Sequence, residues 1–82
     1  LYISTDSTLA MAGQAEKLAE QLNYTKGIIN AQIRRGNVFQ IRAELIKTLT
    51  SYQSALKLAE QINDTVSIAR ITGNMGLLYS AM

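Results

Sequence analysis

Residues 15–39 read AEKLAEQLNYTKGIINAQIRRGNVF, and residues 55–79 read ALKLAEQINDTVSIARITGNMGLLY. The two stretches align without a gap at an offset of 40 residues. The identical positions are Ala15, Lys17, Leu18, Ala19, Glu20, Gln21, Asn23, Thr25, Ile28 and Gly36, which recur as Ala55, Lys57, Leu58, Ala59, Glu60, Gln61, Asn63, Thr65, Ile68 and Gly76. A fixed period of this length is typical of repeat proteins, in which supersecondary units stack on one another. Such stacks usually present a surface for binding rather than a catalytic pocket.

The composition is that of one small folded domain without the usual catalytic side chains. Of 82 residues, 48% are hydrophobic and 17% are charged, which favours a packed segment over a disordered one. The chain has no cysteine and no histidine, so it lacks thiol nucleophiles and the commonest metal ligand and general base. Glu16 and Glu20 lie one helical turn apart, but we interpret them as residues of a solvated face. We expect no enzyme activity, no metal and no cofactor.

Charge and hydropathy limit the classes of partner. The net charge is +2, and the loose basic cluster of Arg34, Arg35, Arg42 and Lys47 lacks interleaved aromatic residues. We therefore expect no nucleic-acid binding. No apolar run reaches the roughly 20 residues that a membrane helix needs, so we expect no membrane insertion by this segment. The compartment, cytoplasmic or periplasmic, stays open.

Apolar residues recur at helical spacing throughout, and proline is absent. The pattern predicts an all-α chain of four helices, at about Asp6–Leu22, Thr25–Ile41, Glu44–Ile62 and Thr65 to the end. Asn23 and Asn63 suit the left-handed residue that closes a helix. The remaining junction, around Arg42–Glu44, lacks glycine, proline, asparagine and aspartate. We favour a turn there over one continuous helix from Thr25 to Ile62, because so long a helix would leave much of its apolar stripe in water.

The repeated residues resemble those of tetratricopeptide repeats, in the form of about 40 residues found in bacterial regulators and sensor kinases. Units of that family are pairs of antiparallel helices, A and B, with a small residue in mid helix A, an aromatic residue three positions later and an alanine late in helix B. Gly36 with Phe39, and Gly76 with Tyr79, match the first two features, and Ala15 and Ala55 match the third. HEAT-type repeats have a similar period but usually contain proline, so we rank them lower.

The resemblance implies antiparallel helical hairpins stacked as an α-solenoid in the order B, A–B, A. Residues 1–82 would then form one segment of a longer array, with a partial unit at about 1–24, a complete unit at 25–64 and a partial unit at 65–82. Both glycines are expected at buried helix crossings. The sequence departs from the family where Ala43 replaces the glycine between helices A and B, and where Arg35 replaces an apolar residue. We interpret Arg35 as laying its aliphatic stem on apolar surface.

In this family a partner peptide or helix binds the concave surface that helix A lines. The resemblance places there Asn30, Ile33, Arg34, Asn37, Gln40, Arg70, Asn74 and Leu77. Arg34 and Arg70 could bind a carboxylate through charge-assisted hydrogen bonds. The expected function is protein–protein interaction, as a scaffold within a bacterial sensor or regulatory protein. The alternative is a structural spacer or self-association segment without a specific ligand.

The ends of the stack are expected to be apolar. The first helix carries Leu9 and Leu18 with no A helix before it, and the last carries Ile71, Met75, Leu78 and Met82 on one stripe. Contiguous apolar patches are rarely left open in soluble monomers. We therefore expect flanking repeats of the same chain to cover these ends, or the isolated segment to self-associate.

Overall fold

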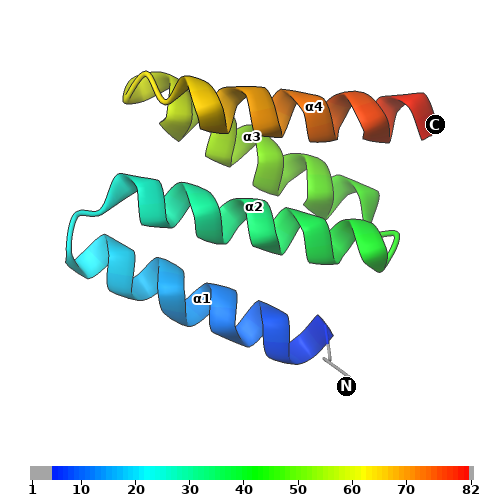
Figure 1. Cartoon of the computed structure of the whole chain (residues 1–82). Helices are drawn as coiled ribbons and strands as arrows, with labels where there is room; N and C mark the ends of the chain where they lie inside the picture. The colour runs from blue at the N-terminus through cyan, green and yellow to red at the C-terminus, as the bar shows by residue number, and fades with distance from the viewer. Residues whose placement is uncertain (1–4, 82) are drawn as a thin grey trace.

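In the computed structural model, which describes residues 5–81, the chain forms a ladder of antiparallel helices (Figure 1). The helices are α1 (Thr5–Gln21), α2 (Thr25–Ile41), α3 (Leu45–Gln61) and α4 (Thr65–Ala81). Each has 17 residues, and α3 packs against both α2 and α4. The all-α prediction is confirmed, and α2 ends at Ile41, which excludes a continuous helix to Ile62. Met82, which the sequence analysis placed on the apolar stripe of the last helix, and residues 1–4 lie outside the described residues.

The three turns share one backbone geometry. Their central residues have positive φ: 55° at Asn23, 59° at Ala43 and 54° at Asn63. In each turn the amide of that residue and the next amide donate backward to carbonyls of the last helical turn, as in Ala43 N to Gln40 O at 3.0 Å and Glu44 N to Phe39 O at 2.9 Å. This pairing is the Schellman motif, which satisfies helix-end carbonyls. The turn at residues 42–44 therefore forms without glycine, and an alanine adopts the left-handed conformation.

The three described junctions differ in how the following helix begins. Tyr24 and Glu44 occupy the N-cap positions of α2 and α3 without a side-chain cap bond. Asp64 precedes α4, and its Oδ1 accepts a hydrogen bond from the Ser67 amide at 3.2 Å while Ser67 Oγ donates to its Oδ2 at 2.6 Å. Both bonds lower the pKa of the Asp64 carboxyl, and the bond from the Ser67 hydroxyl has the larger effect. Asp64 thus caps the start of α4.

The main core lies among α2, α3 and α4. Its fully buried members are Ile29, Ile33, Tyr52, Ala55, Ala59 and Ile71. Leu56, Leu58, Ile68 and Met75 pack against them as partly buried residues. Helix α1 contributes less, since its buried residues are the small Ala12 and Ala19. The apolar interior is therefore concentrated in the later three helices.

The two repeated glycines have different surroundings. Gly36 is buried, and a Cβ built on it would lie 2.6 Å from Cε1 of the Tyr52 ring. Gly76 is exposed, and nothing lies within 4 Å of the same hypothetical atom. The prediction of a buried crossing is confirmed at Gly36 and wrong at Gly76. The reason is positional, because no described helix covers the side of α4 that corresponds to the α3-facing side of α2.

The expectation that the Ile71 stripe of α4 forms an apolar end of the stack, to be covered by flanking repeats or self-association, is also wrong. Ile71 is fully buried and Leu78 is 6% exposed, because this stripe packs against the core. The large apolar side chains that α4 exposes are Val66, Leu77 and Tyr79. On α1, by contrast, Leu18 is 57% exposed, as expected, and Leu22 is 67% exposed. The exposed apolar surface therefore consists of Leu18 and Leu22 on α1, and of Val66, Leu77 and Tyr79 on α4.

The Gly36 contact predicts opposite effects of one substitution at two equivalent positions. Gly36→Ala places a methyl group against a buried ring and should destabilise the fold by about 1–3 kcal/mol. Gly76→Ala meets open space in an exposed helix interior and should stabilise it by up to about 1 kcal/mol. Urea denaturation followed by circular dichroism measures both. Equal effects in the two variants would contradict the packing role of Gly36.

The left-handed turn predicts that Ala43→Gly stabilises the protein. A left-handed alanine costs about 1–2 kcal/mol, whereas glycine adds unfolded-state entropy worth about 0.4–1 kcal/mol, so a net gain of about 0.5–1 kcal/mol is expected. The control is Ala10→Gly, at an exposed position inside α1, which should lose about 1 kcal/mol. Thermal melts compare the two, and a lower melting temperature for Ala43→Gly would contradict the assigned geometry.

Candidate binding surface

The residues predicted to line a concave surface separate into several groups. Asn37, Gln40 and Asn74 converge on the hydroxyl group of Tyr52, and Asn30 and Arg34 line a groove between α1 and α2. Arg70 and Leu77 are exposed on α4, Leu77 by 71%. Ile33 is 1% exposed and belongs to the core. Ile33 is therefore a packing residue of the core and not part of the exposed surface.

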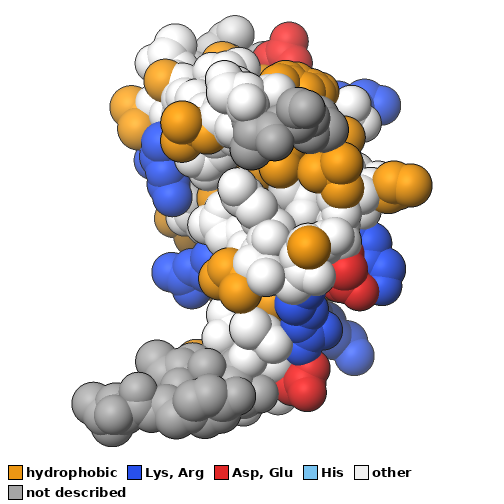
Figure 2. Space-filling model, turned by 90° about the vertical axis from the view of Figure 1, so that its right-hand side faces the viewer, with side chains coloured by type: hydrophobic (Ala, Val, Ile, Leu, Met, Phe, Trp, Pro, Cys, Tyr) orange, Lys and Arg blue, Asp and Glu red, His pale blue; other side chains and the backbone are white. Residues whose placement is uncertain are grey.

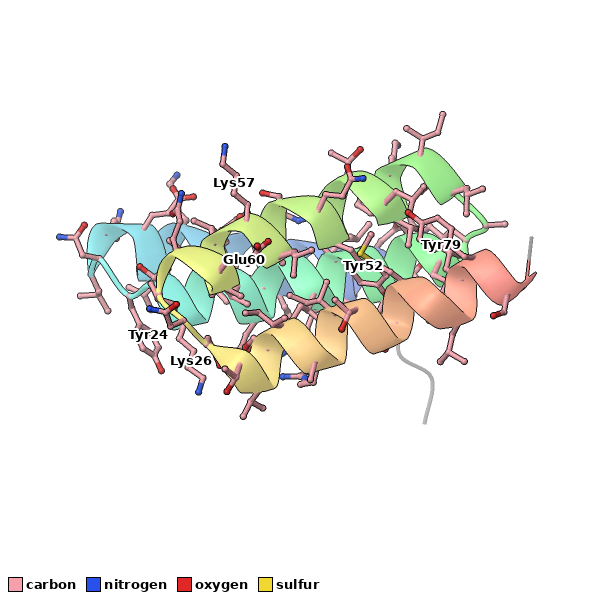
Figure 3. All side chains as sticks on the ribbon, turned by 90° about the horizontal axis from the view of Figure 1, so that it is seen from above. Tyr24, Lys26, Tyr52, Lys57, Glu60 and Tyr79 are labelled. Carbon is pink, nitrogen blue, oxygen red and sulfur yellow. The ribbon has the colours of Figure 1, made fainter. Side chains whose placement is uncertain are left out.

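Tyr52 connects three helices through one side chain. Its ring lies in the core, between the ribbons of α3 and α4 in Figure 3. Its hydroxyl group hydrogen-bonds to Asn37 Oδ1, lies 3.2 Å from Gln40 Oε1, and also interacts with the Asn74 side chain. A buried tyrosine generally needs a partner for its hydroxyl. Here α2 and α4 supply it, so the amides at their surface are held from below.

Burial raises the pKa of the Tyr52 phenol, and the Asn74 hydrogen bond lowers it by less. The folded state therefore favours the neutral phenol. A neutral phenol donates one hydrogen, which is shared between Asn37 Oδ1 and the more distant Gln40 Oε1 at 3.2 Å. With each oxygen turned to Tyr52, the NH₂ group of each amide is the one left to donate to a partner.

The groove between α1 and α2 has a volume of about 260 Å³. Its lining is mostly apolar and comprises Ala15, Leu18, Ala19, Leu22, Tyr24, Gly27, Asn30, Ala31 and Arg34. The Tyr24 ring leans over Gly27, where a Cβ would lie 2.8 Å from it. Arg34 is the one charged side chain in this lining. The groove is open to solvent, because Leu18, Leu22 and Tyr24 are each more than half exposed.

Cations gather beside the N-terminus of α4. Lys26 and Arg70 both act on the Asp64 carboxylate and help to lower its pKa, after the Ser67 hydrogen bonds. Arg34 lies on α2, and its counterpart 40 residues on is Asn74. Equivalent positions in a repeat face the same side of the stack. Arg70 is equivalent to Asn30, which lies one helical turn before Arg34. Arg34 and Arg70 therefore belong to one side of the stack. That side combines two exposed arginines with the amides anchored by Tyr52.

The contact between α1 and α2 is more polar than the sequence analysis anticipated. Glu16 is held between the helices by an ion pair with Arg35, and Gln32 Nε2 donates to Glu16 Oε1 at 3.1 Å. The interpretation of Glu16 as a solvated residue is wrong, because its side chain is 14% exposed. Arg35 is partly buried, and its charge has a structural partner. The sequence signal for this polar contact is Arg35, which replaces the apolar residue that the family pattern expects.

A second polar contact joins the far ends of the same two helices. Arg42 forms an ion pair with Asp6, and its Nε donates to Thr5 Oγ1 at 2.9 Å. Both Arg35 and Arg42 therefore hold α1 against α2.

Figure 2 views the end of the stack where α2 turns into α3, and hydrophobic side chains lie at its surface among charged ones. Ile41 and Ile46, which flank this turn, are 74% and 81% exposed. The α2–α3 end of the stack therefore carries two exposed isoleucines.

Other kinds of site find no support in the described part of the chain. Residues 5–81 contain no group of three or more acidic, histidine or cysteine residues placed to hold a metal ion. No helix among them has the length and apolar character to cross a membrane. Comparisons with protein-family models, with curated proteins and with solved structures give no match. The function must therefore be argued from the surface itself.

Burial of the Tyr52 phenol predicts a loss of stability in base. The folded pKa lies above the unfolded value of 10.0, so the unfolded state loses its proton first as the pH rises. The contribution is complete below pH 10 and is lost as the pH rises from 10 through the folded pKa. Urea midpoints measured from pH 8 to 11 should fall above pH 10.

Two variants assign this decline to Tyr52. Tyr52→Phe, which cannot ionise, should show a flatter decline from a lower starting stability. Tyr24→Phe, at a ring that is 55% exposed, should keep the decline of the unmodified protein. A Tyr52→Phe protein with an unchanged pH profile would show that this phenol is not the titrating group.

Proposed function

We propose that this chain is a helical-repeat module that binds a protein partner through the side formed by α2 and α4. The observation that carries the proposal is the arrangement around Tyr52. Exposed amides of Asn37 and Gln40 are fixed by a buried hydroxyl group, beside the solvent-exposed Arg34 and Arg70. Fixed donors lose little conformational freedom when they bind, which favours recognition.

The chemistry of this side favours an extended peptide that carries carboxylates. Amide NH₂ groups donate to backbone carbonyls, and arginines bind carboxylates through charge-assisted bonds. The resemblance to tetratricopeptide repeats supports this proposal, because helix A lines the binding surface in that family. The same resemblance supports a more specific proposal. The chain is a scaffold within a bacterial sensor or regulatory protein and is flanked by further repeats of the same kind.

Selection from a displayed library of random 12-residue peptides tests the proposal. Peptides that bind the full chain should be enriched in Asp and Glu. Their affinity should fall at least about tenfold in the double variant Arg34→Glu/Arg70→Glu, since hydrogen bonds to charged groups contribute about 1.5–3 kcal/mol each.

The matched control is Lys17→Glu/Lys57→Glu. These lysines are equivalent in the repeat and exposed on α1 and α3, and Lys57 points away from α4 in Figure 3. The control changes net charge by the same amount and should leave affinity nearly unchanged. Failure to select any peptide, or equal losses in both double variants, would favour a spacer without a specific ligand.

A further inference from the structure

The side formed by α2 and α4 changes character along the helix axes. The two helices run in the same direction (Figure 1), and the side chains of Asn37 and Asn74 meet at Tyr52. Residues at an offset of 40 therefore lie at nearly one level of this side. From the N-terminal end the levels are Lys26 with Val66, Asn30 with Arg70, Arg34 with Asn74, and Asn37 with Leu77, after which Ile41 follows on α2.

The two central levels each carry one arginine. Arg34 lies on α2, and Arg70 lies on α4 one turn earlier in the repeat. Both are exposed, and the ion pairs among residues 5–81 engage other basic side chains. Arg70 acts on Asp64, but each oxygen of that carboxylate already accepts a hydrogen bond from Ser67. The two arginines can therefore bind carboxylates of a partner.

Two large aliphatic side chains occupy the levels after the arginines. Leu77 on α4 is 71% exposed, and Ile41, the last residue of α2, is 74% exposed. Each lies seven residues after the arginine of its own helix, which is about two turns and keeps it on the same side. Val66 is also exposed, but it lies alone at the opposite end of α4, on the level of a lysine. The side thus has a basic half and an aliphatic half.

A neighbouring repeat does not account for the exposed Leu77. Its counterpart Asn37 is exposed although α3 and α4 follow it, and Leu77 is exposed although α2 and α3 precede it. A repeat stacked on either end in the same manner would leave this position in contact with solvent. Ile41 is exposed with α1, α3 and α4 all in place. Large apolar side chains that stay exposed together mark interaction sites.

We propose that this side recognises a carboxylate and an aliphatic side chain that lie three residues apart in an extended peptide. Seven residues of a helix span roughly 10 Å at ~1.5 Å each, and an extended chain covers that length in about three residues at ~3.3 Å each. The carboxylate binds Arg34 or Arg70. The aliphatic side chain packs on Ile41 and Leu77, and the amides anchored by Tyr52 hold the backbone between them.

This inference rests on the proposed function and adds to it the aliphatic residue and the spacing. The test is a pair of parallel selections from a displayed library of random 12-residue peptides, on the unmodified chain and on Ile41→Ser/Leu77→Ser. Both selected pools should be enriched in Asp and Glu. Only the first should carry Leu, Ile or Val three positions from an acidic residue, in either order, more often than the unselected library does.

A peptide from the first pool then measures the contact by fluorescence anisotropy. Ile41→Ser should weaken its binding at least about fivefold, because a buried aliphatic contact is lost. The matched control is Ile46→Ser, at an isoleucine that is 81% exposed on α3, across the turn, and it should leave binding unchanged. Serine in place of the peptide's aliphatic residue should weaken binding to the unmodified chain but have little further effect on Ile41→Ser/Leu77→Ser.

The outcomes separate this inference from the proposed function. Acidic peptides without the three-residue spacing, or equal effects of Ile41→Ser and Ile46→Ser, would overturn the inference and leave an acidic peptide as the partner. A spacing of seven residues would also overturn it, because that spacing places two side chains on one face of a helical partner. Pools without enrichment in Asp and Glu would overturn both the inference and the proposed function.

Discussion

The fold depends on the contact between Tyr52 and Gly36. The ring can lie against the α2 backbone only because that position has no side chain, and a Cβ there would come within 2.6 Å of the ring. The same approach brings the hydroxyl group to Asn37 and Gln40 on α2 and to Asn74 on α4. One residue of α3 thus fixes the spacing of the helices on both sides of it and orients the amides at their surface.

Repetition in the sequence made the architecture predictable. Identical residues at an offset of 40 set the phase of the helices, and Asn23 and Asn63 marked two of the turns. The observed helix boundaries agree with those predicted to within one residue. The turn at Ala43 was harder to foresee, because its geometry is imposed by the packing of α2 on α3. Its positive φ shows that the tertiary contacts outweigh the local preference of alanine.

The candidate site could be predicted only in part, because sequence periodicity assigns a residue to a face but not to a contact. Asn37, Gln40 and Asn74 were assigned to one side by their repeat positions, yet their convergence on Tyr52 depends on the crossing of three helices. Ile33 was assigned to the surface from family position, although its apolar side chain belongs to the core. Gly76 was assigned to a crossing because its counterpart Gly36 is at one. Equivalent positions in a repeat share a direction, but their burial depends on which helix lies opposite.

That same dependence gives the two ends of the stack different chemistry. At α1 the repeat leaves the large exposed residues Leu18 and Leu22 beside the buried Ala31, and the Tyr24 ring lies over Gly27. At α4 it leaves Gly73 and Gly76, with open space around both, beside the exposed side chains of Val66, Leu77 and Tyr79. The two repeats differ at Gly27 and Ala31, where the second has Ser67 and Ile71, whereas Ala15, Leu18 and Ala19 of the groove wall are unchanged. The two ends of the stack therefore present different surfaces, although both are built from equivalent positions of one repeat.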